Sequence, residues 1–275
     1  MMKITGRTRI TGLYGYPVEH TLSPLMHNAA FEYLGIDCCY LPFSVHPDSL
    51  KNAVEAIRAL NLAGVNITIP HKESVIRYLD NVNEEALFIG AVNTIVNQKG
   101  RLSGYNTDGR GFMHALLENN IFTDNKKALI IGAGGASRAI SYYLSEKADK
   151  LYLFDVDKIK LERLASDLSE IRDNINILDN TADLSTFDLL INATPLGLQP
   201  TDPIPMDVSG LSPQQTVCDL IYKKTPLLSL AAQKGCKTLD GLGMLLWQGA
   251  LAFELWTGTA PPVEVMRNAL MRGMK

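Results

Sequence analysis

A glycine-rich turn in the middle of the chain has the residue types that a dinucleotide-binding protein needs. An apolar stretch at residues 128–131 leads directly into the turn, and a helical pattern follows; the turn consists of Gly132, Ala133, Gly134, Gly135 and Ala136. Gly132 permits a tight turn, and Gly134 lets the backbone approach a pyrophosphate group because it carries no Cβ atom. The N–H groups at the helix start favour the negative charge of such a group. Glycine turns also serve simple chain reversal, but this position between a strand and a helix favours a dinucleotide site.

Asp155 stands where a dinucleotide-binding fold carries its ribose-binding carboxylate. It ends the next predicted strand, 155 − 132 = 23 residues after Gly132. A carboxylate there accepts hydrogen bonds from both ribose hydroxyls of NAD and repels the 2′-phosphate of NADP. The residue by itself therefore favours NAD; the alternative is a solvated turn residue before a helix that begins at Lys158.

A lysine and an aspartate in the first part of the chain could exchange a proton with a substrate. Lys72 follows a predicted strand over residues 65–69 and lies in the first turn of a predicted helix over residues 71–79. The helix dipole disfavours the charged ammonium form there, which suits a lysine that acts as acid and base near neutral pH. The alternative for Lys72 is a solvated surface residue. Asp108 lies in a second polar turn, where two domains are expected to meet.

The elements that must position these residues alternate between short strands and helices. In the first part, strands are predicted at residues 10–14, 39–43, 65–69, 91–96 and 101–105, and helices at residues 24–34, 47–60 and 71–79. Continuous apolar stretches, typical of parallel strands buried on both faces, follow at residues 128–131, 151–154, 175–178, 189–192 and 217–220. Helices are predicted over residues 136–145 and 158–168, with two more between residues 243 and 274. This succession predicts an α/β protein with right-handed crossovers.

Length and composition exclude several classes of protein. The 275 residues suit two domains, and 26 Lys and Arg against 29 Asp and Glu give a net charge of −3, which argues against nucleic acid as a partner. The most apolar stretch, residues 242–256, is too short to cross a bilayer. The four cysteines form no C-x-x-C motif and the five histidines have no zinc-site spacing, so free thiols and no metal are expected. We expect a soluble cytoplasmic protein with a small-molecule substrate.

Several separate motifs, in order along nearly the whole chain, resemble the shikimate dehydrogenase family. In the first part they are Gly15-Tyr16-Pro17-Val18, Ser23-Pro24 with His27-Asn28, Asn66-Ile67-Thr68 with Pro70 and Lys72, Gly90-Ala91-Val92-Asn93-Thr94, and Asn106-Thr107-Asp108-Gly109. In the second part they are the glycine turn, Asn192-Ala193-Thr194-Pro195, Asp219-Leu220-Ile221-Tyr222, and Asp240-Gly241-Leu242-Gly243-Met244-Leu245 with Gln248. The resemblance implies a substrate domain of residues 1–108 and 244–275, a Rossmann-type dinucleotide domain of residues 109–243, and an active cleft between the two.

The resemblance also implies an activity and a set of roles. The reaction would be the reversible reduction of 3-dehydroshikimate to shikimate with NADP or NAD, in aromatic amino acid biosynthesis. Lys72 would be the catalytic acid and base, and Asp108 its partner on the substrate hydroxyl. The ring hydroxyls would be bound by Thr68, Asn93 and Gln248, and the carboxylate by Thr21, Tyr222 and Ser23, the last as N-cap of a helix whose start favours an anion. The dinucleotide would contact the glycine turn, Asp155, Glu84, Leu220 and Gly241.

Two departures from the family pattern leave alternatives open. The family commonly has Ser where Thr21 stands, and many members carry Asn-Arg where this chain has Asp155-Val156, with the arginine serving a 2′-phosphate. An NAD-dependent quinate/shikimate dehydrogenase is therefore one alternative. A non-catalytic, dinucleotide-sensing regulator on the same fold is a second, and a folate-type dehydrogenase a third. The sequence is compatible with a monomer or a homodimer.

Overall fold

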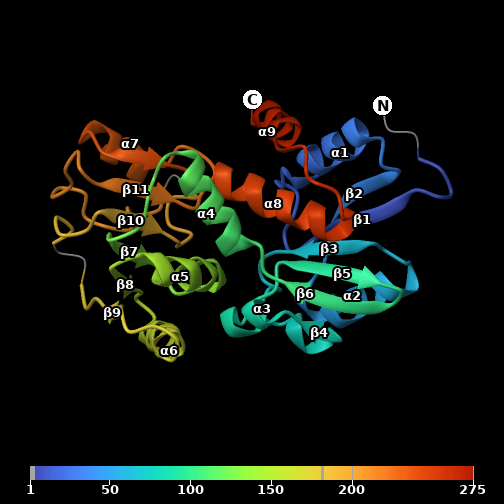
Figure 1. Ribbon diagram of the computed structural model, residues 1–275, viewed down its shortest axis with the longest axis horizontal. Coiled ribbons are helices and arrows are strands. Elements are labelled where there is room, and N and C mark those ends of the chain that lie inside the picture. The colour runs from blue at the N-terminus through green and yellow to red at the C-terminus, as the bar shows by residue number, and fades with distance from the viewer. Residues whose placement is uncertain (1–3, 181–182, 200, 275) are drawn as a thin grey trace. The chain divides into compact units, whose positions relative to one another are not determined.

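The computed structural model describes residues 4–180, 183–199 and 201–274, which divide into two compact units. The first unit contains the residues up to Thr107 together with those from Leu246 onward, and the second extends from Asp108 to Leu245. Each unit is built on one six-stranded sheet with helices packed against it (Figure 1). The predicted α/β fold class is confirmed.

The sheet of the first unit is mixed, with the order β2-β1-β3-β5-β6-β4. Its strands are β1 (Arg9–Gly15), β2 (Cys38–Ser44), β3 (Gly64–Ile67), β4 (Asn81–Val82), β5 (Thr94–Gln98) and β6 (Arg101–Tyr105). β1 pairs in parallel with β2 and β3, whereas β5 runs antiparallel to both β3 and β6. Because β3 and β5 run in opposite directions, the end of β3 lies beside the start of β5.

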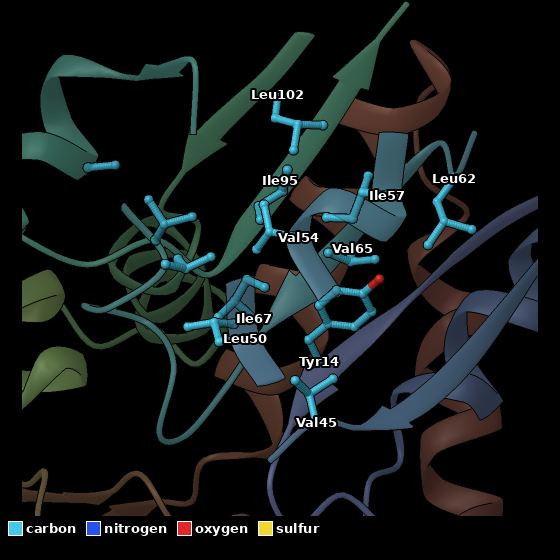
Figure 2. Packing of buried hydrophobic residues seen from close by; sticks show 13 residues of the cluster. Tyr14, Val45, Leu50, Val54, Ile57, Leu62, Val65, Ile67, Ile95 and Leu102 are labelled. Carbon is cyan, nitrogen blue, oxygen red and sulfur yellow. The ribbon is translucent and has the colours of Figure 1, made fainter. Parts of the chain in front are cut away.

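Apolar side chains of helix α2 (Leu50–Ala59) cover one face of this sheet. Val54 and Ile57 of α2 pack against Val65 and Ile67 of β3 and against Ile95 of β5 in one buried cluster (Figure 2). The other helices of the unit are α1 (Ser23–Leu34), α3 (Glu84–Ile89), α9 (Val263–Gly273) and most of α8 (Leu242–Thr257), with two short 3-10 helices, η1 (Pro47–Ser49) and η2 (Ile76–Tyr78). The sheet thereby gives a rigid frame to the polar residues at the strand ends.

The sheet of the second unit is entirely parallel, with the order β9-β8-β7-β10-β11-β12. Its strands are β7 (Lys127–Ile131), β8 (Lys150–Phe154), β9 (Ile175–Ile177), β10 (Leu189–Asn192), β11 (Thr216–Asp219) and β12 (Lys237–Leu239). The connecting helices are α4 (Asp108–Glu118), α5 (Gly135–Lys147), α6 (Lys158–Ser169) and α7 (Pro226–Gln233). Numbered by chain order, the sheet reads 3-2-1-4-5-6, the arrangement of a dinucleotide-binding Rossmann fold.

Two local predictions were wrong. The segment expected to be a helix over residues 71–79 is a turn followed by η2. Lys72 is therefore not in the first turn of an α-helix, and the argument from a helix dipole does not apply to it. Helix α1 begins at Ser23 itself, with Leu22 as N-cap and no capping bond from a side chain, so Ser23 is not the N-cap. Among the helices of the described residues, none combines the length and apolar composition that a membrane span requires.

Candidate functional site

The glycine turn after β7 combines a strained position with an open one. Gly132 has a positive φ of 113°, and a Cβ atom there would lie 3.0 Å from the carbonyl carbon and oxygen of Ala193. Gly134 has an ordinary extended backbone, and no atom lies within 4 Å of the Cβ it lacks. The backbone conformation at position 132 thus requires glycine. At position 134 a side chain would meet no protein atom and would occupy only the open space beside the turn. That open cradle fits a pyrophosphate at the start of α5.

The turn lies at the point where the strand order of the sheet reverses. β7 and β10 are neighbours, and Ala193 after β10 donates its N–H to the carbonyl of Ile131. In open α/β sheets, ligands bind outside the carboxyl ends of the strands at this switch point. The predicted turn residues, from Gly132 to Ala136, are therefore where a dinucleotide site is expected.

Asp155 follows β8 and is tied to the glycine turn. Its Oδ2 accepts a hydrogen bond from the Ala133 N–H at 2.6 Å, and its Oδ1 accepts one from the Asp157 N–H at 2.8 Å. The carboxylate is half-buried, and Val156 beside it is 87% exposed. Asp155 is therefore part of the structure of the turn, rather than a freely solvated residue.

Leu220 and Gly241 lie together after β11 and β12. Gly241 donates its N–H to the carbonyl of Ile221 at 3.1 Å, and a Cβ at Gly241 would collide with the carbonyl of Leu220. Beneath this loop lies Asp219, a buried carboxylate that sequence reasoning did not single out. It accepts hydrogen bonds from Asn192 Nδ2, the Ile221 N–H and the Thr225 hydroxyl at 2.8–3.1 Å. Burial raises the pKa of Asp219, and these donors oppose that shift.

In the first unit, Thr68 and Lys72 lie in the turn that follows β3. The Thr68 N–H donates to the carbonyl of Tyr14, and the Lys72 carbonyl accepts the Val92 N–H at 2.8 Å. Buried His71 bonds through Nε2 to the carbonyl of Val45 at 2.7 Å. These bonds hold the backbone of the half-buried Lys72 against Val92, the residue that precedes Asn93.

Asn93 precedes β5 and is almost fully buried. Its Oδ1 accepts the Thr107 N–H at 2.8 Å, and its Nδ2 donates to the Thr107 hydroxyl at 2.9 Å. The Thr107 hydroxyl in turn donates to the backbone carbonyl of Gln248 on α8 at 3.0 Å. The structure thus brings together the segments carrying Thr68, Lys72, Asn93 and Gln248.

The remaining predicted residues lie as follows. Thr21 Oγ1 accepts the Ser23 N–H at 3.3 Å, which holds these two hydroxyl residues in one turn at the start of α1. Glu84 is exposed as the first residue of α3, in the first unit. Asp108 is buried as the first residue of α4, and Tyr222 is 36% exposed; both belong to the second unit. Within the part of the chain that the structure describes, no group of three or more His, Cys, Asp or Glu side chains could hold a metal ion.

The parallel sheet and its glycine turn define a Rossmann dinucleotide-binding unit, and with the polar first unit they place the protein among nicotinamide-dependent oxidoreductases. Comparison with known proteins is in agreement. The family model for the shikimate dehydrogenase substrate binding domain matches residues 13–95, and that for the shikimate 5′-dehydrogenase C-terminal domain matches residues 241–271. The shikimate dehydrogenase (NADP(+)) of Desulforamulus reducens is 48% identical over 98% of this chain and 96% of its own. The chain belongs to the shikimate dehydrogenase family.

Solved structures agree with this assignment. A crystal structure of a shikimate dehydrogenase in complex with NADP+ is 40% identical, with a TM-score of 0.94 over 99% of this chain and 98% of its own. The shikimate 5-dehydrogenase of Listeria monocytogenes, in complex with shikimate and NAD, is 37% identical, with a TM-score of 0.90 over 98% of both chains. The predicted family is confirmed, and the quinate and regulator alternatives are not favoured.

Proposed function

We propose that this protein catalyses the reversible, nicotinamide-dependent reduction of 3-dehydroshikimate to shikimate. The observation that carries the proposal is the convergence of Thr68, Lys72, Asn93 and Gln248 through the hydrogen bonds around Asn93 and Lys72. A polyol acid needs several hydroxyl and amide partners, and one group that exchanges a proton. This end of the first sheet supplies both.

Lys72 is the proposed acid and base. It donates a proton to the oxygen on carbon 3 of the ring during reduction and takes it back during oxidation. Asp108 is proposed to act with it on the same oxygen. When bound, the nicotinamide supplies or accepts the hydride. The substrate is held by the ring-hydroxyl partners Thr68, Asn93 and Gln248 and by the carboxylate partners Thr21, Ser23 and Tyr222.

We assign substrate binding to the first unit and dinucleotide binding to the second. The residues proposed to hold the dinucleotide in the second unit are the glycine turn Gly132, Ala133, Gly134, Gly135 and Ala136, with Asp155, Leu220 and Gly241. Glu84 of the first unit remains a proposed contact. The open cradle at Gly134 supports this assignment, because a close backbone approach requires that space.

For the choice of dinucleotide, we propose a preference for NAD over NADP. The eight curated relatives compared are all named for NADP(+), whereas the solved structures hold NADP+ in some cases and NAD in others, so the preference for NAD rests on Asp155. Asp155 follows β8 with its carboxylate at the glycine turn, where a negative charge opposes a 2′-phosphate. The next residue is the apolar, exposed Val156, which offers such a phosphate no counter-charge.

Replacement of Lys72 tests the reaction. We expect Lys72→Ala to lower kcat by at least ~100-fold with a little-changed KM for shikimate, because general acid–base catalysis typically contributes that much. Lys51→Ala, at an exposed position of α2, is the matched control. Near-normal turnover in Lys72→Ala would remove this lysine from the mechanism.

Replacement of Asp155 tests the cofactor preference. Asp155→Asn should reduce the ratio of kcat/KM with NAD to kcat/KM with NADP by roughly tenfold, the effect of one charge-assisted hydrogen bond. Asp157→Asn, two residues away, makes the same change in charge at a helix cap that asparagine also satisfies. An unchanged ratio in Asp155→Asn would contradict the carboxylate argument. Rates on shikimate and quinate with each dinucleotide complete the test of substrate choice.

A further inference from the structure

A buried chain of hydrogen bonds runs beneath the proposed substrate residues of the first unit, and Tyr40 lies within it. Tyr40, in β2, has no exposed surface. Its hydroxyl donates to Asn66 Oδ1 at 2.9 Å. One hydroxyl group therefore connects β2 to the middle of β3.

The chain continues from Asn66 to Asn93. Asn66 Nδ2 donates to the Thr94 hydroxyl at 3.0 Å and to the Asn93 carbonyl at 3.1 Å. The Thr94 hydroxyl donates to Asn93 Oδ1 at 3.0 Å, and Thr107 extends the chain to the Gln248 backbone. Asn93 is a proposed hydroxyl partner, so the chain leads from Tyr40 to the substrate site.

Helix α1 holds both the backbone and the ring of Tyr40. Asn28 accepts the Tyr40 N–H at 2.7 Å and donates to the Tyr40 carbonyl at 3.0 Å. The His27 ring stacks on the Tyr40 ring, with centroids 4.4 Å apart and planes 8° from parallel. The phenol oxygen thus has a fixed position, from which it can hold Asn66 in a defined geometry.

A phenylalanine would keep the ring, its stacking and its packing, so the hydroxyl group calls for a separate explanation. We propose that Tyr40 is a positioning residue: its hydroxyl orients the Asn66 amide group, which in turn holds the hydroxyl-binding Asn93 in place. In a buried environment each bond of such a chain is strong, and a missing link leaves its partners unsatisfied. This inference rests on the proposed function, because it assumes that the ring acid binds along this chain.

The test compares Tyr40→Phe with Tyr33→Phe, a control on α1 whose ring is 67% exposed. We expect Tyr40→Phe to raise the KM and the calorimetric dissociation constant of shikimate by roughly fivefold to tenfold, the effect of one buried hydrogen bond. The KM of the dinucleotide should not change, and Tyr33→Phe should behave like the wild type. An unchanged shikimate affinity in folded Tyr40→Phe would overturn the positioning role.

A double-mutant cycle separates positioning from general loosening of the fold. If Tyr40 acts along this chain, Thr94→Val and Tyr40→Phe together should weaken shikimate binding at least threefold less than the product of the single effects. Independent effects that multiply would overturn the proposal. Should Tyr40→Phe not fold, a cycle of Asn93→Ala with Thr94→Val tests the same chain and is read in the same way. A wild-type chain that neither oxidises nor binds shikimate would overturn the proposed function as well, which distinguishes the two failures.

Discussion

His27 is a buried histidine whose burial predicts how the stability of the first unit depends on pH. Its ring has no exposed surface, and neither Nδ1 nor Nε2 has a hydrogen-bond partner among the described residues. Aromatic rings surround it, since it stacks on Tyr40 and lies 5.3 Å from Trp256 and 6.5 Å from Phe253 between centroids. Among the described residues no hydrogen bond compensates for burying an imidazolium here, so the folded protein keeps the ring neutral.

Burial lowers the pKa of His27 from 6.5 to about 3. Because the folded-state pKa lies below the unfolded-state value, the neutral ring costs no stability above pH 6.5. As the pH falls below 6.5, the unfolded chain takes up a proton that the folded chain does not. The free energy of unfolding then falls by about 1.4 kcal/mol per pH unit. Between pH 8 and pH 5 this one group removes about 2 kcal/mol.

The assay is urea unfolding of the wild type and of His27→Phe from pH 8 to pH 5, followed by tryptophan fluorescence. Both tryptophans, Trp247 and Trp256, belong to the first unit, so the signal reports on the unit that contains His27. Other groups titrate in both proteins, so the difference between the two unfolding free energies isolates His27. His20→Phe, at an exposed position, controls for removing an imidazole from the unfolded chain. A difference that stays constant over this range would refute the reasoning, because His27 would then accept a proton within the fold.

Three further substitutions test the site and its frame. Gly134→Ala should fold normally and raise the KM of the dinucleotide, whereas Gly132→Ala should lower the melting temperature even without ligand; equal thermal melting of the two variants would contradict the division of roles. Gly64→Ala should reduce the free energy of unfolding by about 1–3 kcal/mol in urea titrations, because a Cβ there would collide with the Trp256 ring and with the Ile95 carbonyl to which this ring donates. An unchanged free energy of unfolding would argue against the close packing. Asp219→Asn should lower the free energy of unfolding by about 1–3 kcal/mol, because an NH2 group would replace one of the two carboxylate oxygens that accept these three hydrogen bonds; an unchanged melting curve would contradict the bonding at this carboxylate.

The parts of the fold that sequence could predict are those decided by local pattern. The strand expected at residues 101–105 is β6 to the residue, and the strand expected at residues 189–192 is β10. Both are short segments bounded by turn or loop residues. Buried and more exposed residues alternate along β6, and all four residues of the apolar β10 are buried. The glycine turn was equally visible, because a tight turn between a strand and a helix restricts residue type at fixed positions.

One error arose where a tertiary hydrogen bond replaces a local one. The Lys72 carbonyl, which an α-helix would pair with the Ile76 N–H, accepts the Val92 N–H from the neighbouring segment, and the Ile76 N–H donates to the Glu73 carbonyl instead. Val92 is distant in sequence, so no local pattern could have shown this bond. Ser23 has the residue type of an N-cap, yet α1 begins at Ser23 itself, with Leu22 at the cap position and no capping bond from a side chain.

For the same reason, sequence motifs indicated the residues proposed to contact the substrate but not the buried residues that hydrogen-bond to them. Tyr40 and Asn66 acquire their roles only when β2 and β3 flank β1 in one sheet, which brings a phenol and an amide from distant segments within 2.9 Å. Tyr40 also lies between a buried polar group that is hydrogen-bonded and one that is not. Its hydroxyl belongs to a chain whose members satisfy one another, while its face covers His27, whose ring nitrogens have no partner in the described residues. Tyr40→Phe removes only the hydroxyl and His27→Phe only the ionisable ring, so the first should weaken shikimate binding and the second should change acid stability.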